Sequence, residues 1–375
     1  MAMRRALTVH PRRSRLQPVP IPCPCRYRPE PPLVTPRAAG SERAHAPKLE
    51  VTSDMTHDLE TNRNLGRRML LGAGAVLAAG SAVPAMAGTA AAGTNGGVKV
   101  PAPDSPLPII PVPAQVKATE ALAPLPDARL WYWDTGGSGA PVIFLHPGTG
   151  SSESWPYQQP YFAKKGYRVI AYSRRGHFKS DAGPADRTGT EAEDLRLLLD
   201  HLRVDRFHGV GVAAGGGTLL DFALSHPERV RTITLAGSLT GLAEPAYQET
   251  LKRLRPEGFY DMGADFIELG PTYRAANPEG VQQWLEIHHR ASHTDVSQPY
   301  ENRPLWADLE RLDIPTFLAW GDGDLYSPPS VQRLLAAHLR RSASLVVNEC
   351  GHQPHWERSD IFNPALLNFL RRHSR

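Results

Sequence analysis

Short apolar runs alternate with segments of helical periodicity from about residue 127 to the C-terminus. Residues 130–134 alternate as in a strand, and residues 141–146 (PVIFLH) are continuously apolar, as in a strand buried on both faces. Residues 188–202 carry apolar side chains at helical spacing, and Thr190 precedes acidic residues that favour a helix start. Further strands are predicted over 167–172, 230–235, 316–320 and 344–347. This alternation predicts an α/β fold with a mostly parallel sheet flanked by helices.

One stretch, RFHGVGVAAGGGTLL over residues 206–220, reads as an apolar strand, a glycine-rich turn and a helix. This is the layout of a nucleophile elbow, in which the pattern G-x-S-x-G places a serine on a sharp strand-to-helix turn. The glycines are needed there because backbone passes close to backbone. Aligned with Gly211 and Gly215, the pattern puts Ala213 where the serine would stand. We therefore predict the elbow geometry without its nucleophile.

The N-terminal third differs in composition from the rest. Residues 1–54 are rich in proline and arginine and have no apolar periodicity. We interpret them as a disordered arm or as an upstream region included through a misassigned start codon. Residues 88–126 are rich in alanine and glycine and then in proline, which predicts an extended linker. The α/β domain is then expected over residues 127–375.

A secretory signal is predicted over residues 55–87. Arg67 and Arg68 precede a short apolar stretch, and small residues end at Ala87, which together form a twin-arginine signal peptide. We expect cleavage after Ala87, the Tat translocase as a partner during export, and a periplasmic or secreted location in a bacterium. The apolar stretch is short for a stable membrane span, although an uncleaved anchor or a surface helix is the alternative.

The basic character of the chain belongs to its first 87 residues. They hold 13 of the 42 lysine and arginine residues and 6 of the 38 acidic ones, which leaves 29 basic against 32 acidic residues, a net charge of −3, over 88–375. This balance gives no support to a nucleic-acid partner. Cys350 is the one cysteine after residue 87, and no cysteine pairs have metal-ligand spacing. We expect no cofactor and no metal.

Four motifs in a fixed order identify a family. They are HPGTGSSESW at 146–155, SRRGHFKSD at 173–181, the elbow, and a late acid and histidine in WGDGDLYSPP and CGHQPHWE. In this order, residues 127–375 resemble the α/β-hydrolase fold. The resemblance implies a helical cap at about 241–305, inserted after the sixth strand. It also implies Asp324 as the acid and His352 as the histidine, with Asp322 and His355 fitting the pattern less well.

These positions suggest a catalytic arrangement. Asp324 would orient one ring nitrogen of His352 and leave the other as a base. The backbone N–H groups of Gly148 and Ala214 would form an oxyanion hole. The candidate substrate contacts are His146 and the cap residues Tyr273 and Trp284.

A methyl group at residue 213 cannot attack a carbonyl, so three functions stay open. In the first, a hydrolase acts on a small apolar ester, lactone or carbonyl compound, with water activated by His352. In the second, His352 deprotonates the substrate of a cofactor-free oxygenase or a lyase. In the third, the protein binds a small ligand without reaction. We favour the hydrolase.

Other polar residues near the predicted site have simpler interpretations. Possible substitute nucleophiles are interpreted as turn residues: Thr149, Ser151, Ser152 and Ser238. Arg174 and Arg175 could meet an anionic substrate or form structural salt bridges. The cap histidines lack an acidic partner at zinc-motif spacing and are interpreted as solvated: His288, His289 and His293.

Overall fold

The computed structural model describes residues 107–374 apart from residues 239, 240 and 295. The predictions for the arm over 1–54, for the signal over 55–87 and for the first part of the linker lie outside these residues. Within the described ranges, no helix is both long enough and apolar enough to cross a lipid bilayer.

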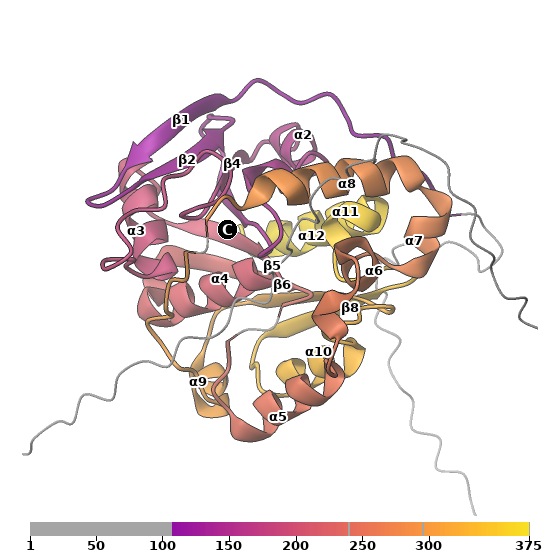
Figure 1. Ribbon diagram of the computed structural model, residues 1–375. Helices are drawn as coiled ribbons and strands as arrows, with labels where there is room; N and C mark the ends of the chain where they lie inside the picture. The colour runs from indigo at the N-terminus through magenta and orange to yellow at the C-terminus, as the bar shows by residue number, and fades with distance from the viewer. Residues whose placement is uncertain (1–106, 239–240, 295, 375) are drawn as a thin grey trace, which may run out of the picture. The chain divides into compact units, whose positions relative to one another are not determined.

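One sheet of eight strands organises this part of the chain, in the order β1-β2-β4-β3-β5-β6-β7-β8 (Figure 1). Strands β1 and β2 are antiparallel to each other, and β2 is antiparallel to β4. All pairings from β4 through β8 are parallel. The strands are β1 (Thr119–Pro124), β2 (Arg129–Asp134), β3 (Pro141–Leu145), β4 (Arg168–Tyr172), β5 (Phe207–Val212), β6 (Val230–Ala236), β7 (Thr316–Gly321) and β8 (Ser342–Val347). The predicted mostly parallel α/β sheet is confirmed.

Strand β1 lies inside the segment predicted to be a linker. Its six residues pair with β2 from Thr119 opposite Asp134 to Pro124 opposite Arg129. Upstream of it, the Tyr157 hydroxyl donates a hydrogen bond to the Ile110 carbonyl at 3.0 Å. The linker prediction is therefore wrong over β1, and the domain begins before residue 127. The sequence TEALAP lacks the alternation that would have indicated a strand.

Helices cover both faces of the sheet. Alternate residues of β3 point to opposite faces, with Ile143 in one apolar cluster and Phe144 in the other. The first face is covered by α3 (Glu191–His201), α4 (Ala214–Ser225) and α10 (Pro329–Ala337), and the second by α2 (Gln159–Ala163) and α12 (Ser359–Arg372). Burial on both faces explains why the central strands read as continuous apolar runs.

Helix α3 begins where its sequence indicates. The Thr190 side chain accepts a hydrogen bond from the Glu193 backbone N–H at 3.1 Å, so Thr190 is the N-cap. Acidic residues in the first turn favour the positive end of the helix dipole. The helix start predicted at Thr190 is therefore confirmed.

Between β6 and β7 the chain forms five helices within the described residues, and they divide into two groups (Figure 1). Helices α6 (Ala264–Glu268), α7 (Pro271–Ala276) and α8 (Pro278–Ala291) form the cap. Helices α5 (Pro245–Leu254) and α9 (Trp306–Arg311) instead contribute Tyr247 and Leu309 to the apolar core cluster that also contains residues of α4. The helical insertion is confirmed, but α5 belongs to the layer that covers the sheet. The short remaining helix α11 spans Pro354–Glu357, and the 3-10 turns are Ser152–Ser154, Pro227–Arg229 and Phe259–Asp261.

Candidate active site

The turn between β5 and α4 has the geometry of an elbow. Ala213 has φ 49° and ψ −116°, a left-handed conformation that residues with a Cβ rarely adopt. A Cβ on Gly211 would lie 2.4 Å from the Gly215 carbonyl oxygen, and one on Gly215 would lie 2.1 Å from the Leu145 carbonyl oxygen. Both glycines are therefore required by close backbone contacts. Ala213 itself stays 9% exposed.

His352 and Asp324 form a buried pair. The His352 Nδ1 atom lies 2.8 Å from Asp324 Oδ2, and both side chains are almost fully buried. Asp324 follows β7 and His352 follows β8, so neighbouring parallel strands bring them to the same edge of the sheet. The other carboxylate oxygen of Asp324 accepts hydrogen bonds from the backbone N–H groups of Tyr326 and Ser327, at 2.8 and 3.0 Å. These bonds fix the carboxylate, which in turn fixes the imidazole.

Charges around His352 favour its protonated form. Burial alone lowers the pKa of the imidazole, but the adjacent Asp324 carboxylate and the more distant Glu268 and Glu357 carboxylates raise it above its ordinary value. The ring is thus a stronger base than a solvated histidine.

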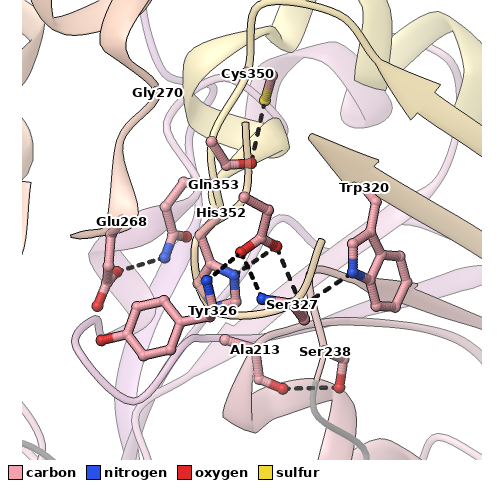
Figure 2. A network of polar contacts seen from close by, with 12 residues as sticks. Ala213, Ser238, Glu268, Gly270, Trp320, Tyr326, Ser327, Cys350, His352 and Gln353 are labelled. Carbon is pink, nitrogen blue, oxygen red and sulfur yellow. Dashed lines mark hydrogen bonds and ion pairs between the residues drawn. The ribbon is translucent and has the colours of Figure 1, made fainter. Parts of the chain in front are cut away.

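The elbow lies beside this pair. Ala213 donates its backbone N–H to the Ala236 carbonyl at 3.0 Å, and the next residue, Gly237, has room only for a hydrogen because a Cβ there would lie 3.0 Å from His352 Nδ1. The Ser238 hydroxyl donates to the Ala213 carbonyl at 2.9 Å (Figure 2). A Cβ on Gly148 would lie 3.8 Å from the Ala214 Cβ, so the loop after β3 contacts the start of α4. The five residues predicted for the catalytic arrangement are thus brought to one edge of the sheet.

Glu268, the last residue of α6, is a site residue that sequence reasoning missed. Its Oε2 atom accepts hydrogen bonds from the Thr149 hydroxyl at 2.9 Å and the Gln353 amide at 2.6 Å. Its backbone carbonyl accepts the His352 N–H at 2.8 Å. Burial, only partly offset by the attraction of His352, raises the pKa of Glu268 to about 7. No motif marks this residue, because its partners are distant in the sequence.

Glu357 supports the loop that carries His352. Its carboxylate accepts backbone N–H groups from Gly351, Gln353 and Gly270, at distances between 2.7 and 3.0 Å. Burial raises the pKa of this carboxyl to about 7, although the three N–H donors act in the opposite direction. Glu357 ends the CGHQPHWE motif, so the sequence held a signal for it that we did not use.

The predicted substrate contacts lie in packed surroundings. His146 is 0% exposed, with Nε2 accepting the Arg174 backbone N–H at 3.0 Å and Nδ1 2.7 Å from the Pro147 carbonyl. Burial and the Arg174 charge hold the pKa of His146 well below its ordinary range. Tyr273 and Trp284 are 3% and 5% exposed and share an apolar cluster with Tyr157. These environments support packing for the three residues rather than substrate contact.

The hydroxyls considered as substitute nucleophiles make local bonds. Ser151 accepts the Glu153 N–H at 3.2 Å, Ser173 donates to Ser152 at 3.0 Å, and Thr149 donates to Glu268. Asp322 accepts the Cys350 N–H at 3.2 Å, which joins the loops after β7 and β8. Burial lowers the pKa of His355 to about 3, and its ring packs 4.6 Å from that of Trp155.

The remaining charged candidates form structural contacts. Arg174 pairs with Glu191 at 2.9 Å and Arg175 with Asp194 at 2.7 Å, all of them buried or nearly so, which supports the salt-bridge alternative. His288 stacks on Trp284 with ring centroids 5.5 Å apart. Among the described residues, no group of three or more histidine, cysteine or acidic side chains could hold a metal ion.

Comparison with known proteins agrees with this geometry. The family model described as alpha/beta hydrolase fold matches residues 140–276. A 2-hydroxy-6-oxononadienedioate/2-hydroxy-6-oxononatrienedioate hydrolase from Burkholderia vietnamiensis is 31% identical over 271 residues, which cover 66% of this chain and 92% of the relative. A 2-hydroxy-6-oxo-6-phenylhexa-2,4-dienoate hydrolase from Comamonas testosteroni is 30% identical over 269 residues, 64% of this chain and 91% of the relative.

A solved structure has the same fold. The bromoperoxidase from Bacillus anthracis is 25% identical and superimposes with a TM-score of 0.55, covering 68% of this chain and 100% of that one. Together with the parallel sheet, the elbow and the buried His352–Asp324 pair, these matches show that the chain belongs to the α/β-hydrolase fold family.

Proposed function

We propose that the protein is a hydrolase of a small, largely apolar carbonyl compound in which His352 activates a water molecule. The observation that carries this proposal is the 2.8 Å bond between His352 Nδ1 and Asp324 Oδ2 beside an elbow that presents the methyl group of Ala213. A carboxylate on Nδ1 leaves Nε2 as the proton acceptor. Because no hydroxyl stands at residue 213, the nucleophile is water rather than the enzyme.

The backbone N–H groups of Gly148 and Ala214 are proposed to stabilise the developing oxyanion. Their segments are in contact, since a Cβ on Gly148 would lie 3.8 Å from the Ala214 Cβ. Ala214 is the first residue of α4, where backbone N–H groups have no partner in the helix and the dipole favours negative charge. Such donors act without depending on the side chain at residue 213.

The relatives suggest which bond is broken. Their names describe compounds with hydroxyl, keto and carboxylate groups, and no ester, lactone or amide linkage. A hydrolase of such a compound must break a carbon–carbon bond beside the keto group. We therefore favour ketones of this type over esters as substrates of the present protein.

His352 takes a proton from water as the water oxygen bonds to the keto carbon, and the carbonyl electrons move onto oxygen, where the N–H groups hold them. Collapse of this oxyanion breaks the adjacent carbon–carbon bond. The carbon that leaves receives the proton from His352, which yields a carboxylic acid and a second fragment with a new carbon–hydrogen bond.

The test is turnover of 2-hydroxy-6-oxodienoates, esters, lactones and enolisable aromatic ketones, with and without oxygen. We expect acid release that contains one oxygen atom from labelled water, and loss of activity in His352→Ala. An exposed histidine outside the site provides the matched control, His201→Ala, which should keep parent activity. Oxygen uptake would instead indicate a cofactor-free oxygenase, and ligand binding without turnover a binding protein.

We also propose that the protein is exported through the twin-arginine pathway and cleaved after Ala87. The support is the sequence alone, with Arg67 and Arg68 ahead of the apolar stretch. In a bacterial host, the native protein should begin at Gly88 in the periplasmic fraction or the medium. Replacing both arginines with lysine should leave uncleaved protein inside the cell. Export of that variant at the parent level would contradict the proposal.

A further inference from the structure

A hollow lies at the edge of the sheet opposite the candidate active site. It has a volume of about 960 Å³ and is lined by six arginines, Arg206, Arg231, Arg303, Arg311, Arg341 and Arg372, which we call the arginine hollow. Arg206 directly precedes β5 and Arg341 directly precedes β8, at the amino ends of these strands. The elbow and His352 follow the carboxyl ends of the same two strands. The hollow is therefore separate from the site described above.

Most of these guanidinium groups lack acidic partners. Arg311 pairs with Asp308, and Arg341 lies 3.9 Å from Asp313. The other four arginines form no ion pair with any residue that the structure describes. The Nε atom of Arg231 is buried and has no hydrogen-bond partner in the described chain. A buried donor without an acceptor is unusual in a folded protein, and no described acidic group compensates it.

The local charge contrasts with that of the surrounding chain. Six arginines and two aspartates give the hollow a charge of +4, whereas residues 88–375 together carry 29 basic and 32 acidic residues. The positive charge of the hollow also affects a buried residue. Burial, together with the charges of Arg231, His373 and Arg206, lowers the pKa of His208 to about 4. Like charges gathered in a concave surface repel one another, and a bound anion would remove that repulsion.

The lining indicates the chemistry of the anion. A guanidinium group binds phosphoryl oxygens through paired hydrogen bonds. A cluster of guanidinium groups therefore favours an anion that carries several phosphoryl groups. Three prolines in the lining, Pro227, Pro304 and Pro315, have no N–H to donate, and the six arginines supply the cationic donors. The lining has no phenylalanine, tyrosine or tryptophan on which a base could stack. We propose that the arginine hollow binds a compact polyanion with several linked phosphoryl groups.

The experiment measures thermal unfolding of the full chain with tripolyphosphate, at ionic strength held constant with sodium chloride. The first 87 residues contain 13 lysine and arginine residues, to which anions would also bind in every variant. Thermal unfolding of the α/β domain is the readout because it reports on the domain that contains the hollow. We expect the midpoint to rise with tripolyphosphate and the apparent Kd to weaken by about tenfold in Arg303→Ala and in Arg231→Ala. Arg333→Ala provides the matched control, since Arg333 is an exposed arginine of α10 outside the hollow.

Arg303 is exposed, so its variant should fold even if the Arg231 variant does not. A nucleoside triphosphate should raise the midpoint as tripolyphosphate does, because the phosphoryl chain is the recognised part. Equal Kd values in Arg303→Ala and Arg333→Ala would overturn the proposal. So would a response to the nucleoside triphosphate without one to tripolyphosphate, or a midpoint that chloride raises equally.

Discussion

Ala213 keeps the strained backbone of an elbow although its side chain has no reactive group. Its φ of 49° is unfavourable for any residue with a Cβ, by about 1–3 kcal/mol. The contacts of Gly211 and Gly215 with neighbouring backbone explain how the surrounding structure holds this conformation. The side chain of residue 213 is therefore presented to the site whatever its identity.

Replacing Ala213 with serine should restore a reactive hydroxyl. We expect a serine-directed fluorophosphonate probe to label Ala213→Ser at residue 213 and to leave the parent unlabelled, as judged by mass spectrometry of peptides. The double variant that also carries His352→Ala should lose the label, because the hydroxyl then has no base. Labelling of the parent at any serine would show that another nucleophile exists.

The Asp324 carboxylate should set both the rate and the pH dependence. In Asp324→Asn, we expect kcat to fall by about 10⁴, the size of loss seen when a triad aspartate becomes an amide. Because Asp324 raises the pKa of His352 and the free base is the active form, activity falls as pH drops through that pKa. The variant should move this acidic limb to lower pH, measured as kcat against pH. An unmoved limb would mean that another group controls it.

Among individual residues, those that lie in a linear motif could be predicted from the sequence, namely Ala213, Asp324 and His352. Their short patterns encode a turn after a strand, which is local information. Glu268 escaped prediction because its bonds to Thr149 and Gln353 join residues 119 and 85 positions apart. The bond of His146 to the Arg174 backbone was likewise not predictable, because the two residues are 28 positions apart.

Among the elements, α6 connects the cap to the loops that carry the candidate site residues. Glu268 at its end contacts the loop after β3 through Thr149 and the loop after β8 through Gln353. These bonds connect the cap to both sides of the site. Their strength depends on whether the carboxyl is ionised.

Glu268 should make stability depend on pH. Its pKa is about 7 in the folded protein against 4.5 for an ordinary glutamate, so between these values the folded state keeps a proton that the unfolded chain has lost. Stability from this group is therefore greatest below pH 4.5 and is lost as pH rises through 7. The Glu268→Gln variant lacks this pH-dependent group. The difference between its free energy of unfolding and that of the parent should therefore increase as pH rises, by at most about 3 kcal/mol.

Urea unfolding at a series of pH values measures this slope. The exposed Glu257 gives a control, because Glu257→Gln should leave the slope of the parent unchanged. A Glu268→Gln variant with the parent slope would contradict the assignment of a shifted pKa to this carboxyl.

Strand β1 should contribute to stability as a part of the sheet. A chain beginning at residue 127 loses the whole β1–β2 pairing and the packing of Ala123, which is fully buried. We expect its Tm to fall by more than about 4 °C relative to a chain beginning at residue 107, measured by circular dichroism. Equal Tm values would mean that β1 is dispensable.

The central elements were predictable because burial on both faces leaves a strong apolar signal, as in β3 and β5. The predicted ends of helices and strands differ from the observed ends by up to three residues, because caps and bulges determine where an element ends. Strand β1 and the assignment of α5 to the core were missed for a different reason. Both depend on tertiary partners, β2 for the strand and the apolar core cluster for the helix, that no local pattern reveals.

For the molecule as a whole, the two ends of the parallel sheet carry different chemistry. Buried acids and His352 lie beyond the carboxyl ends of the strands, and the arginine hollow lies at the amino ends. The form that begins at residue 88 combines 29 basic with 32 acidic residues, so its net charge of −3 conceals this separation. No local pattern indicated the hollow, because its arginines are spread from residue 206 to residue 372.

The concentration of arginines at one end of the sheet should determine how the protein binds to an ion exchanger. We expect the form beginning at residue 88 to be retained on a sulfonate cation exchanger at neutral pH and low salt, against its net charge. Arg303→Ala should elute at lower salt than the equally charged Arg333→Ala; coelution would mean that the hollow does not face the resin. Protein held in this way would point its cap toward the mobile phase, so a column loaded with it should keep converting substrate as it flows past.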